Sequence, residues 1–273
     1  MFKALWEHWP EYLMEAAELG MFMISACVFA TILGHPASPI AKALPHPTAQ
    51  RLLIGIAMGL TAVAILYSPW GQRSGGHLNP AVTLTFLRLG KVEPWDAVFY
   101  IGAQFLGGTA GVVVATAFLH EAVAHPAVHH VTTMPGDAGP LVAFAAEFGI
   151  SFILMSVVLR VSNTSALARY TPVFAGALVA LYIMLEAPIS GMSMNPARTL
   201  GSALAAQLWT SLWIYFTAPP LGMLAAAEVY RRQKGGRAVI CAKLHHHNGR
   251  RCIFRCGYQA TQKGSPQYSS SRV

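Results

Sequence analysis

The triplet Asn-Pro-Ala occurs twice in the sequence, and its residue types suit the start of a helix. The two copies are Asn79-Pro80-Ala81 and Asn195-Pro196-Ala197. Asparagine is favoured at the N-cap and proline at the first helical position, so each triplet predicts a helix that begins there. The apolar runs that follow cover only residues 80–89 and 196–206. At 1.5 Å per residue, about ten residues cannot cross a bilayer core of ~30 Å.

Two such helix ends would create a positive electrostatic potential if they meet inside a membrane. Each N-terminus carries roughly half a positive charge, and two facing ends repel cations, protons included. The Asn side-chain NH2 groups remain free to donate to a passing oxygen. Arg198 follows three residues after Asn195 and adds a full charge to an apolar region, where charged residues are costly and usually functional. The competing interpretations are two plain Asn-Pro turns and a structural ion pair of Arg198.

The rest of the chain must then supply membrane-spanning elements. Its 273 residues are 54% hydrophobic and only 11% charged, against roughly 25% charged in soluble domains. A soluble protein could not cover its surface with so few charges. Six longer apolar runs predict spanning helices. They cover residues 19–33, 52–67, 97–119, 141–159, 173–185 and 210–227. The predicted fold is an all-α membrane protein with six transmembrane helices and two re-entrant half-helices.

The two halves of the chain repeat each other. Residues 74–83 are echoed by residues 190–199, and residues 16–20 by residues 145–149. Each half runs span, span, half-helix, span, and an odd number of spans gives the halves opposite topology. This is the inverted repeat of membrane transport proteins, whose functional site lies where the repeats meet. The glycine pairs Gly55/Gly59 and Gly107/Gly111 predict close helix packing, although such pairs are also common in apolar segments.

The charge distribution predicts the orientation. Ten of the 19 Lys and Arg residues lie between residues 231 and 272, and no acidic residue follows Glu228. The third connection, residues 120–140, has no Lys or Arg. Under the positive-inside rule both termini are cytoplasmic. We therefore expect a channel domain at residues 1–230 and a basic, Cys- and His-containing cytoplasmic tail at residues 231–273, with residues 264–273 disordered. No cleavable signal peptide is evident.

The residues around both triplets resemble the two signatures of the aquaporin (major intrinsic protein) family. The resemblance extends over roughly residues 16–230 and includes the Thr-Thr-Met-Pro-Gly stretch at residues 132–136. It implies a right-handed six-helix bundle that forms a homotetramer in the plasma or inner membrane of the cell, with one pore per subunit. It implies a passive channel for water, with no enzymatic activity, no cofactor and no nucleic-acid partner.

The resemblance also assigns roles to single residues. It implies a selectivity filter and two acids that accept hydrogen bonds from the loop backbone beside the half-helices. The filter residues are Met58, Ile183, Met192 and Arg198, and the acids are Glu18 and Glu147. Water-selective members of the family usually carry His where Ile183 stands and an aromatic residue where Met58 stands. Glycerol channels usually carry Asp after the arginine, where this chain has Thr199.

This filter predicts a wider solute range than water alone. One donor and three apolar walls suit water together with small neutral solutes such as glycerol, urea or hydrogen peroxide. The alternative is a secondary transporter built from inverted repeats, which needs alternating access and a coupling ion. Glu186, near the outer end of the fifth span, has no assigned role.

Cysteines in the tail form a separate signal. Cys241, Cys252 and Cys256 lie near His245, and thiolate and imidazole are ligands that suit zinc. The spacing Cys-x10-Cys-x3-Cys is not that of a standard zinc finger. A metal or redox site and an unstructured tail with reduced thiols remain alternatives, and a membrane-anchored metal or redox sensor is the corresponding third function class. Cys27 is predicted to be a buried apolar filler.

Overall fold

The computed structural model describes residues 1–235, 238–246 and 248–258, and this part of the chain is helical without strands. Within it, six helices are long and apolar enough to cross a membrane, as predicted. They are α1 (Phe2–Gly34), α3 (Pro47–Tyr67), α6 (Pro94–Leu119), α8 (Pro140–Ser162), α9 (Thr171–Leu185, preceded by the 3-10 turn η2, Ala168–Tyr170) and α12 (Leu212–Lys234). The predicted all-α membrane fold is therefore confirmed.

Both predicted half-helices are present and begin at the prolines of the triplets. They are α5 (Pro80–Arg88) and α11 (Pro196–Ala206). Shorter helical pieces fill the connections. These are α2 (Pro39–Ala43), α4 (Pro69–Ser74), α7 (Glu121–Ala124), η1 (His129–Val131) and α10 (Ala187–Ser190).

The first span is much longer than predicted. Hydropathy placed its start at residue 19, whereas α1 begins at Phe2. The N-terminal half of α1 contains Glu11, Glu15 and Glu18, which are all fully buried against the protein. These acids lower the local hydropathy although they face the bundle, so a hydropathy argument places the helix start too late.

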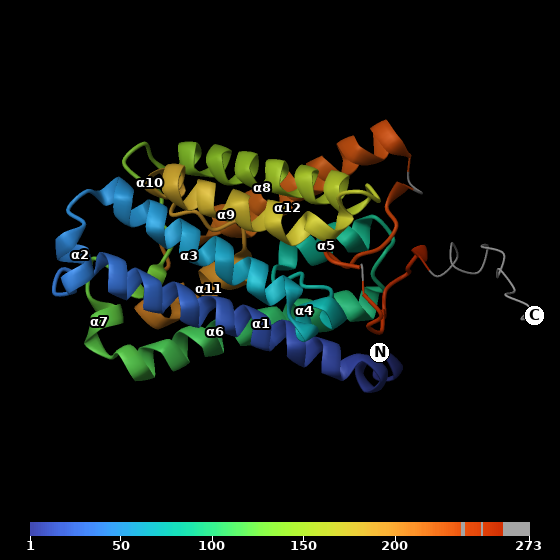
Figure 1. Ribbon diagram of the computed structural model, residues 1–273, viewed down its shortest axis with the longest axis horizontal. Coiled ribbons are helices and arrows are strands. Elements are labelled where there is room, and N and C mark those ends of the chain that lie inside the picture. The colour runs from blue at the N-terminus through green and yellow to red at the C-terminus, as the bar shows by residue number, and fades with distance from the viewer. Residues whose placement is uncertain (236–237, 247, 259–273) are drawn as a thin grey trace, which may run out of the picture.

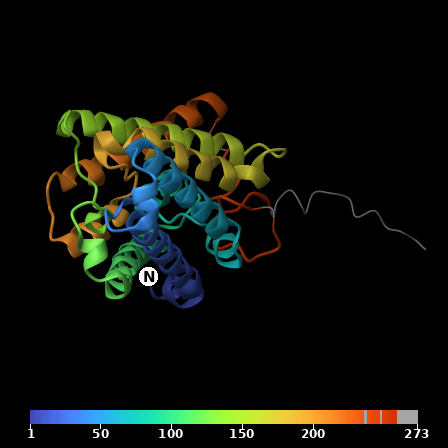
Figure 2. The same cartoon turned by 60° about the vertical axis from the view of Figure 1, so that its left-hand side comes forward.

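Glycines bring the spans into close contact in three pairs: α1 with α6, α3 with α9, and α8 with α12 (Figures 1 and 2). A Cβ atom on Gly107 would lie 2.0 Å from the Ala16 carbonyl oxygen, and one on Gly59 would lie 2.5 Å from the Gly176 oxygen. A Cβ on Gly222 would lie 2.4 Å from the Phe148 oxygen. The predicted small-residue contacts are therefore present, and they hold backbone against backbone, as in other membrane bundles.

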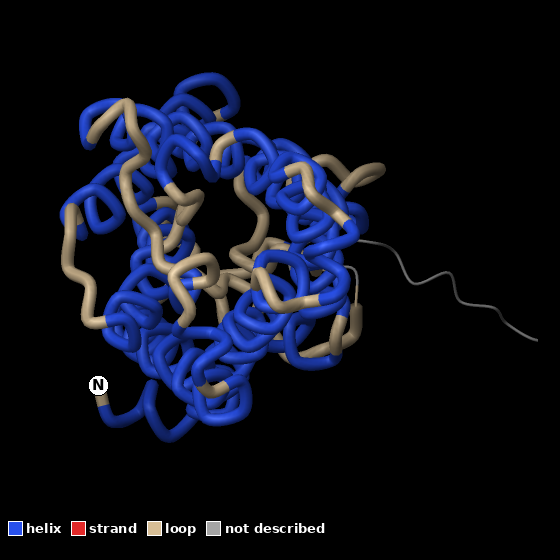
Figure 3. The backbone as a smooth tube through the Cα atoms, turned by 90° about the vertical axis from the view of Figure 1, so that its left-hand side faces the viewer, coloured by secondary structure: helices blue, strands red, loops and turns tan. Residues whose placement is uncertain are grey.

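The two halves interlock around the centre of the bundle. Viewed along the long axis, the helices form a ring and loop segments lie inside it (Figure 3). Half-helix α5, from the first half, packs against α6 and against α12 of the second half; α11 packs against α12 and α6. Each half-helix therefore contacts the last span of both halves, and this places both triplets inside the ring.

The described part of the tail folds back onto the end of the bundle where α1 begins (Figure 1). The Leu244 N–H donates to the Gly75 oxygen at 3.0 Å, and the Ile240 N–H donates to Asn163 Oδ1 at 2.6 Å. Arg255 forms two hydrogen bonds to Glu93, which lower the pKa of that carboxyl. The unstructured-tail interpretation is thus wrong for the described residues up to Tyr258. The predicted disordered stretch, residues 264–273, lies outside the described residues.

Replacing Gly107 with alanine is expected to destabilise the bundle. The new methyl group would meet the Ala16 oxygen at 2.0 Å, so α1 and α6 must separate. Overpacking of this kind costs about 1–3 kcal/mol. The matched control is Gly102→Ala on the same helix, where a Cβ meets nothing within 4 Å. Thermal unfolding in detergent should show a lower midpoint for Gly107→Ala only, and equal midpoints for both variants would contradict the packing argument.

Candidate functional site: a cavity between two helix N-termini

Each half-helix is capped by the asparagine of its own triplet. The Asn79 Oδ1 atom accepts a hydrogen bond from the Ala81 N–H at 2.8 Å. The Asn195 Oδ1 atom accepts from the N–H groups of Ala197 and Arg198 at 3.0 and 3.2 Å. Because the side-chain oxygen satisfies backbone N–H groups that have no partner within the helix, both helices can begin abruptly.

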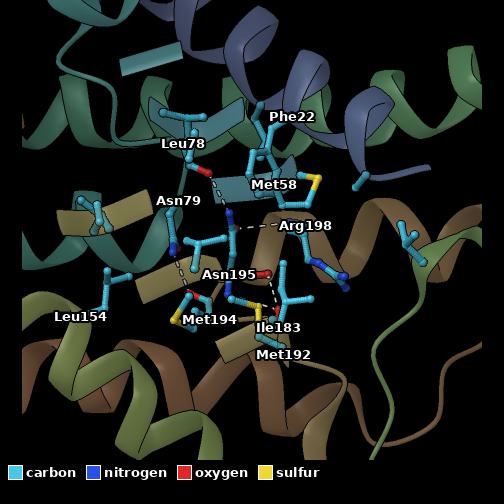
Figure 4. A pocket seen from close by; sticks show the side chains of 18 of the residues that line it. Phe22, Met58, Leu78, Asn79, Leu154, Ile183, Met192, Met194, Asn195 and Arg198 are labelled. Carbon is cyan, nitrogen blue, oxygen red and sulfur yellow. Dashed lines mark hydrogen bonds between the residues drawn. The ribbon is translucent and has the colours of Figure 1, made fainter. Parts of the chain in front are cut away.

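The two asparagines also join the half-helices to each other (Figure 4). Asn79 Nδ2 donates to the Met194 oxygen, and Asn195 Nδ2 donates to the Leu78 oxygen, both at 2.7 Å. Each carboxamide thus donates to the carbonyl of the residue just before the other triplet. An amide NH2 has two hydrogens, so one remains for the cavity. The expectation that the NH2 groups are free is therefore correct for half of their hydrogens only.

The loop before α11 is held by one buried carboxylate. Glu147 accepts hydrogen bonds from the N–H groups of Ser193 and Met194, each at 2.7 Å, and from the Ser190 hydroxyl at 2.7 Å. Met194 has a left-handed backbone with φ of 54°. Irregular backbone at membrane depth has no water to satisfy it, so it needs such internal acceptors.

In the first half two carboxylates divide the same task. Glu18 accepts from the Ser74 hydroxyl at 3.0 Å, whereas Glu15 accepts from the N–H groups of His77 and Leu78 at 2.7 and 2.8 Å. The assignment of loop-backbone support to Glu18 is therefore corrected: Glu15 accepts these two N–H groups. Sequence reasoning missed Glu15 because the repeat matched Glu18 with Glu147, and Glu15 lies one helical turn earlier on the same face of α1.

A cavity of about 370 Å³ passes these asparagines. Its lining includes Asn79 and Asn195 near the middle, Val131 and Thr132 of the third connection, and Leu244 of the tail. The third connection and the tail lie at opposite ends of the bundle (Figure 1). Most of the lining is apolar, so the cavity runs lengthwise through the bundle with few polar groups on its wall.

The structure brings all four predicted filter residues to this cavity, where Figure 4 shows them close to Asn195. Met58 and Met192 are almost fully buried, and Ile183 adds a third apolar wall. Arg198 lines the cavity, and its buried Nη1 atom has no hydrogen-bond partner within the described residues. The arrangement offers one strong donor beside apolar walls.

Thr199, the residue after the arginine, ties the loop before α11 to the third connection. Its hydroxyl shares a hydrogen bond with the Ser193 hydroxyl at 2.6 Å and another with the Thr133 hydroxyl at 2.9 Å. Thr133 belongs to the third connection, which sequence analysis used only for orientation and family resemblance. Glu186 is buried and directly follows α9, at the end of the bundle opposite the tail (Figure 1).

The tail gathers a second group of reactive side chains. Cys241, His246, Cys252 and Cys256 place one ligand atom each within 4.8 Å of all the others. His245, which the sequence analysis included in this set, instead packs its ring against Tyr67 at 5.0 Å between centroids, so His246 takes its place. Cys27 is fully buried in α1, in agreement with its predicted role as a filler.

These features define a polytopic helical membrane protein with two re-entrant helices around an internal cavity. The sequence model of the family described as major intrinsic protein matches residues 4–230. The chain belongs to the major intrinsic protein family.

Curated relatives agree with this assignment, and a solved structure shares the fold. The chain is 43% identical to aquaporin NIP6-1 of Arabidopsis thaliana over 182 residues, covering 65% of this chain and 57% of that protein. It is 36% identical to aquaporin NIP2-3 of Zea mays over 230 residues, covering 82% and 73%. Alignments with NIP6-1 and with maize NIP3-1 span just over half the length of those relatives. The aquaglyceroporin of Plasmodium falciparum, 19% identical, shares the fold with a TM-score of 0.65 over 82% of this chain and 95% of its own.

Removing the carboxylate of Glu147 is expected to disrupt the loop before α11. Glu147→Ala leaves the Ser193 and Met194 N–H groups without their acceptor, at about 1–3 kcal/mol for each group. Glu147→Gln keeps the bonds to Oε1 and loses the one to Oε2, so its loss should be smaller. Thermal unfolding in detergent measures both. Glu121→Ala, at an exposed position on α7, is the control, and equal stability of all three variants would contradict the role.

Proposed function

We propose that this protein is a passive transmembrane channel for water and small neutral solutes, and not an enzyme. The observation that carries the proposal is the lengthwise cavity with Asn79 and Asn195 at its middle, one amide hydrogen of each left for a solute. The relatives named aquaporins support the same function. The channel domain corresponds to residues 1–230.

Exclusion of cations follows from the facing helix ends. The N-termini of α5 and α11 meet through the asparagine bonds, so two partial positive charges lie beside the cavity. Arg198 adds a full charge within the same lining. A cation would lose its hydration shell in a largely apolar passage and meet only repulsion there. We therefore propose that ions and protons are excluded.

The filter favours a solute range wider than water. Met58, Ile183 and Met192 offer flexible apolar surface, and Arg198 offers the donor that a hydroxyl or carbonyl oxygen needs. These side chains can pack against the carbon atoms of a polyol while the hydroxyl groups of the polyol accept hydrogen bonds from the Arg198 guanidinium. Glycerol, urea and hydrogen peroxide are the solutes that we propose in addition to water.

The bonding of three of the buried acids favours a channel over an ion-coupled transporter. Glu15, Glu18 and Glu147 are all engaged with the loops that precede the half-helices. A carboxylate that supports backbone in this way is a poor candidate for a coupling site that must bind and release an ion.

The position of the basic tail indicates the orientation of the chain in the membrane. The N-terminus and the described tail lie at one end of the bundle, and the positive-inside rule makes that end cytoplasmic (Figure 1). We propose a homotetramer in the plasma or inner membrane, with a pore in each subunit, because the family resemblance implies it. Chemical crosslinking in native membranes tests the subunit number.

A permeability panel tests the function as a whole. Proteoliposomes are exposed to osmotic gradients of an impermeant solute, glycerol or urea, and the volume change is followed by stopped-flow light scattering. Linear, non-saturating flux without sodium or proton dependence is expected. Saturable flux that requires either ion would support the transporter alternative instead.

Replacing Ile183 with histidine is expected to narrow the solute range. The imidazole reaches further from the backbone than the isoleucine side chain and adds a second polar group beside Arg198, so glycerol permeability should fall at least about tenfold, or about 1.4 kcal/mol in barrier height. Water permeability should change much less. Ile183→Val, which keeps an apolar wall, is the matched control and should not lower glycerol flux. A parallel fall of water and glycerol in Ile183→His would contradict this assignment.

A further inference from the structure

The tail cluster has the composition and the spacing of a metal site. It contains three cysteine sulfurs and one imidazole nitrogen, with all ligand atoms within 4.8 Å of one another. Cys241 Sγ lies 3.6 Å from Cys252 Sγ, and Cys256 Sγ lies 3.0 Å from His246 Nε2. Zn–S bonds of ~2.3 Å and Zn–N bonds of ~2.0 Å at tetrahedral angles separate ligand atoms by about 3.4–3.8 Å. The four atoms therefore need only small movements to surround one ion.

We propose that Cys241, His246, Cys252 and Cys256 bind one Zn²⁺ ion and thereby hold the tail against the inner end of the cavity. Three thiolates and an imidazole form a closed tetrahedral set, which is typical of structural zinc. Soft sulfur ligands disfavour magnesium and calcium, which prefer oxygen.

The backbone around the cluster is shaped to present these ligands. Lys243 is almost fully buried, and its ammonium donates to the carbonyl oxygens of Arg250 and Arg251 at 3.2 and 2.7 Å. These bonds join the segment before His246 to the segment before Cys252. The Gly257 N–H donates to the Ile240 oxygen at 2.8 Å, so the two ends of the segment are also joined. Burying a lysine in a segment already rich in positive charge is reasonable if it also compensates a thiolate-rich centre.

Ring packing positions the histidine. The His246 ring stacks on the Tyr258 ring at 4.4 Å between centroids with an interplanar angle of 16°. This leaves Nε2 directed at the cysteines, as its contact with Cys256 shows. The neighbouring His245 is directed the other way, against Tyr67 at the bundle surface. The two adjacent histidines thus make different contacts: His246 belongs to the cluster, and His245 packs on the helical bundle.

The cluster is connected to the cavity through the residues between its first two ligands. Leu244 lines the cavity and its N–H binds the Gly75 oxygen. The Ala242 oxygen lies 3.0 Å from His77 Nε2, and the Phe254 ring stacks on His77 at 5.3 Å between centroids. His77 lies two residues before Asn79, so the segment between the ligands covers the inner side of the half-helix loop. That metal loss alters solute flux is a consequence that rests on the proposed channel function.

A disulfide is the competing chemistry for the same cysteines. A disulfide between Cys241 and Cys252 needs a sulfur–sulfur distance of ~2.05 Å, much shorter than the 3.6 Å between these atoms. It would also leave Cys256 and His246 without a role. Zinc binding uses all four residues at once, and for this reason we favour it.

Metal analysis of the full-length protein tests the site directly. The channel is purified in detergent without chelators, and zinc is measured per chain by mass spectrometry. About one equivalent is expected, as for a closed structural site, with at least about a tenfold loss in Cys252→Ala and His246→Ala. Cys27→Ala, a buried cysteine on α1, is the matched control and should keep its zinc. Cobalt substitution should give a thiolate charge-transfer band that Cys252→Ala lacks.

The outcomes separate the metal site from the channel function. Absence of zinc from the wild type, with no tight binding of added Zn²⁺ or Co²⁺, would overturn the proposal, as would two thiols lost to a disulfide in denatured protein. Zinc bound equally by wild type and Cys252→Ala would also overturn it. Stopped-flow flux with and without a zinc chelator adds a second readout. Zinc binding in a protein that conducts nothing would support the site while refuting the proposed channel.

Discussion

The hydrogen bonds from each asparagine to the residue before the other triplet set the geometry at the centre of the molecule. Asn79 and Asn195 each bind their own half-helix through oxygen and the opposite loop through nitrogen. These bonds fix two helix N-termini side by side, although their partial charges repel each other. The six spans and their glycine contacts bring α5 and α11 close enough for the bonds to form. A shift of either half-helix by one residue would replace the asparagine with a residue that can do neither.

Buried acids make the loops before these helices possible. Lipid and apolar side chains cannot satisfy backbone N–H groups, so irregular backbone at this depth needs acceptors from the protein itself. The second half uses Glu147 alone, and the first half uses Glu15 and Glu18 on successive turns of α1. The two halves therefore share the loop conformation, but they differ in the number of carboxylates that support it. Left-handed residues Leu78 and Met194 occupy equivalent places in the two loops.

Periodicity and motif spacing predicted the spans and both half-helix starts, because apolar length and Asn-Pro chemistry are local properties. The repeat also predicted that residues 79 and 195 meet. The repeat failed for Glu15: it pairs Glu18 with Glu147 in sequence, but Glu15 makes the backbone contacts that correspond to those of Glu147. Hydropathy misplaced the start of α1, because hydropathy averaged along the sequence gives a buried acid the same value as an exposed one. The choice between His245 and His246 depends on the fold of the tail, and no spacing rule distinguishes adjacent histidines. Family resemblance supplied the filter positions, which the structure brings to one cavity.

The two ends of the cavity differ in how they are built. Near the end beside the third connection, Arg198 lies on α11, whose start is fixed by Asn195, and Thr199 ties the same turn to the third connection. That end is held by the core of the bundle and can change only if the half-helix moves. At the end beside the tail, Leu244 belongs to a segment joined to the bundle by hydrogen bonds, ring contacts, buried apolar packing and the ion pairs of Arg251 and Arg255. Under the proposed channel function, the filter residues and the residues at the tail end of the cavity therefore belong to separate parts of one chain.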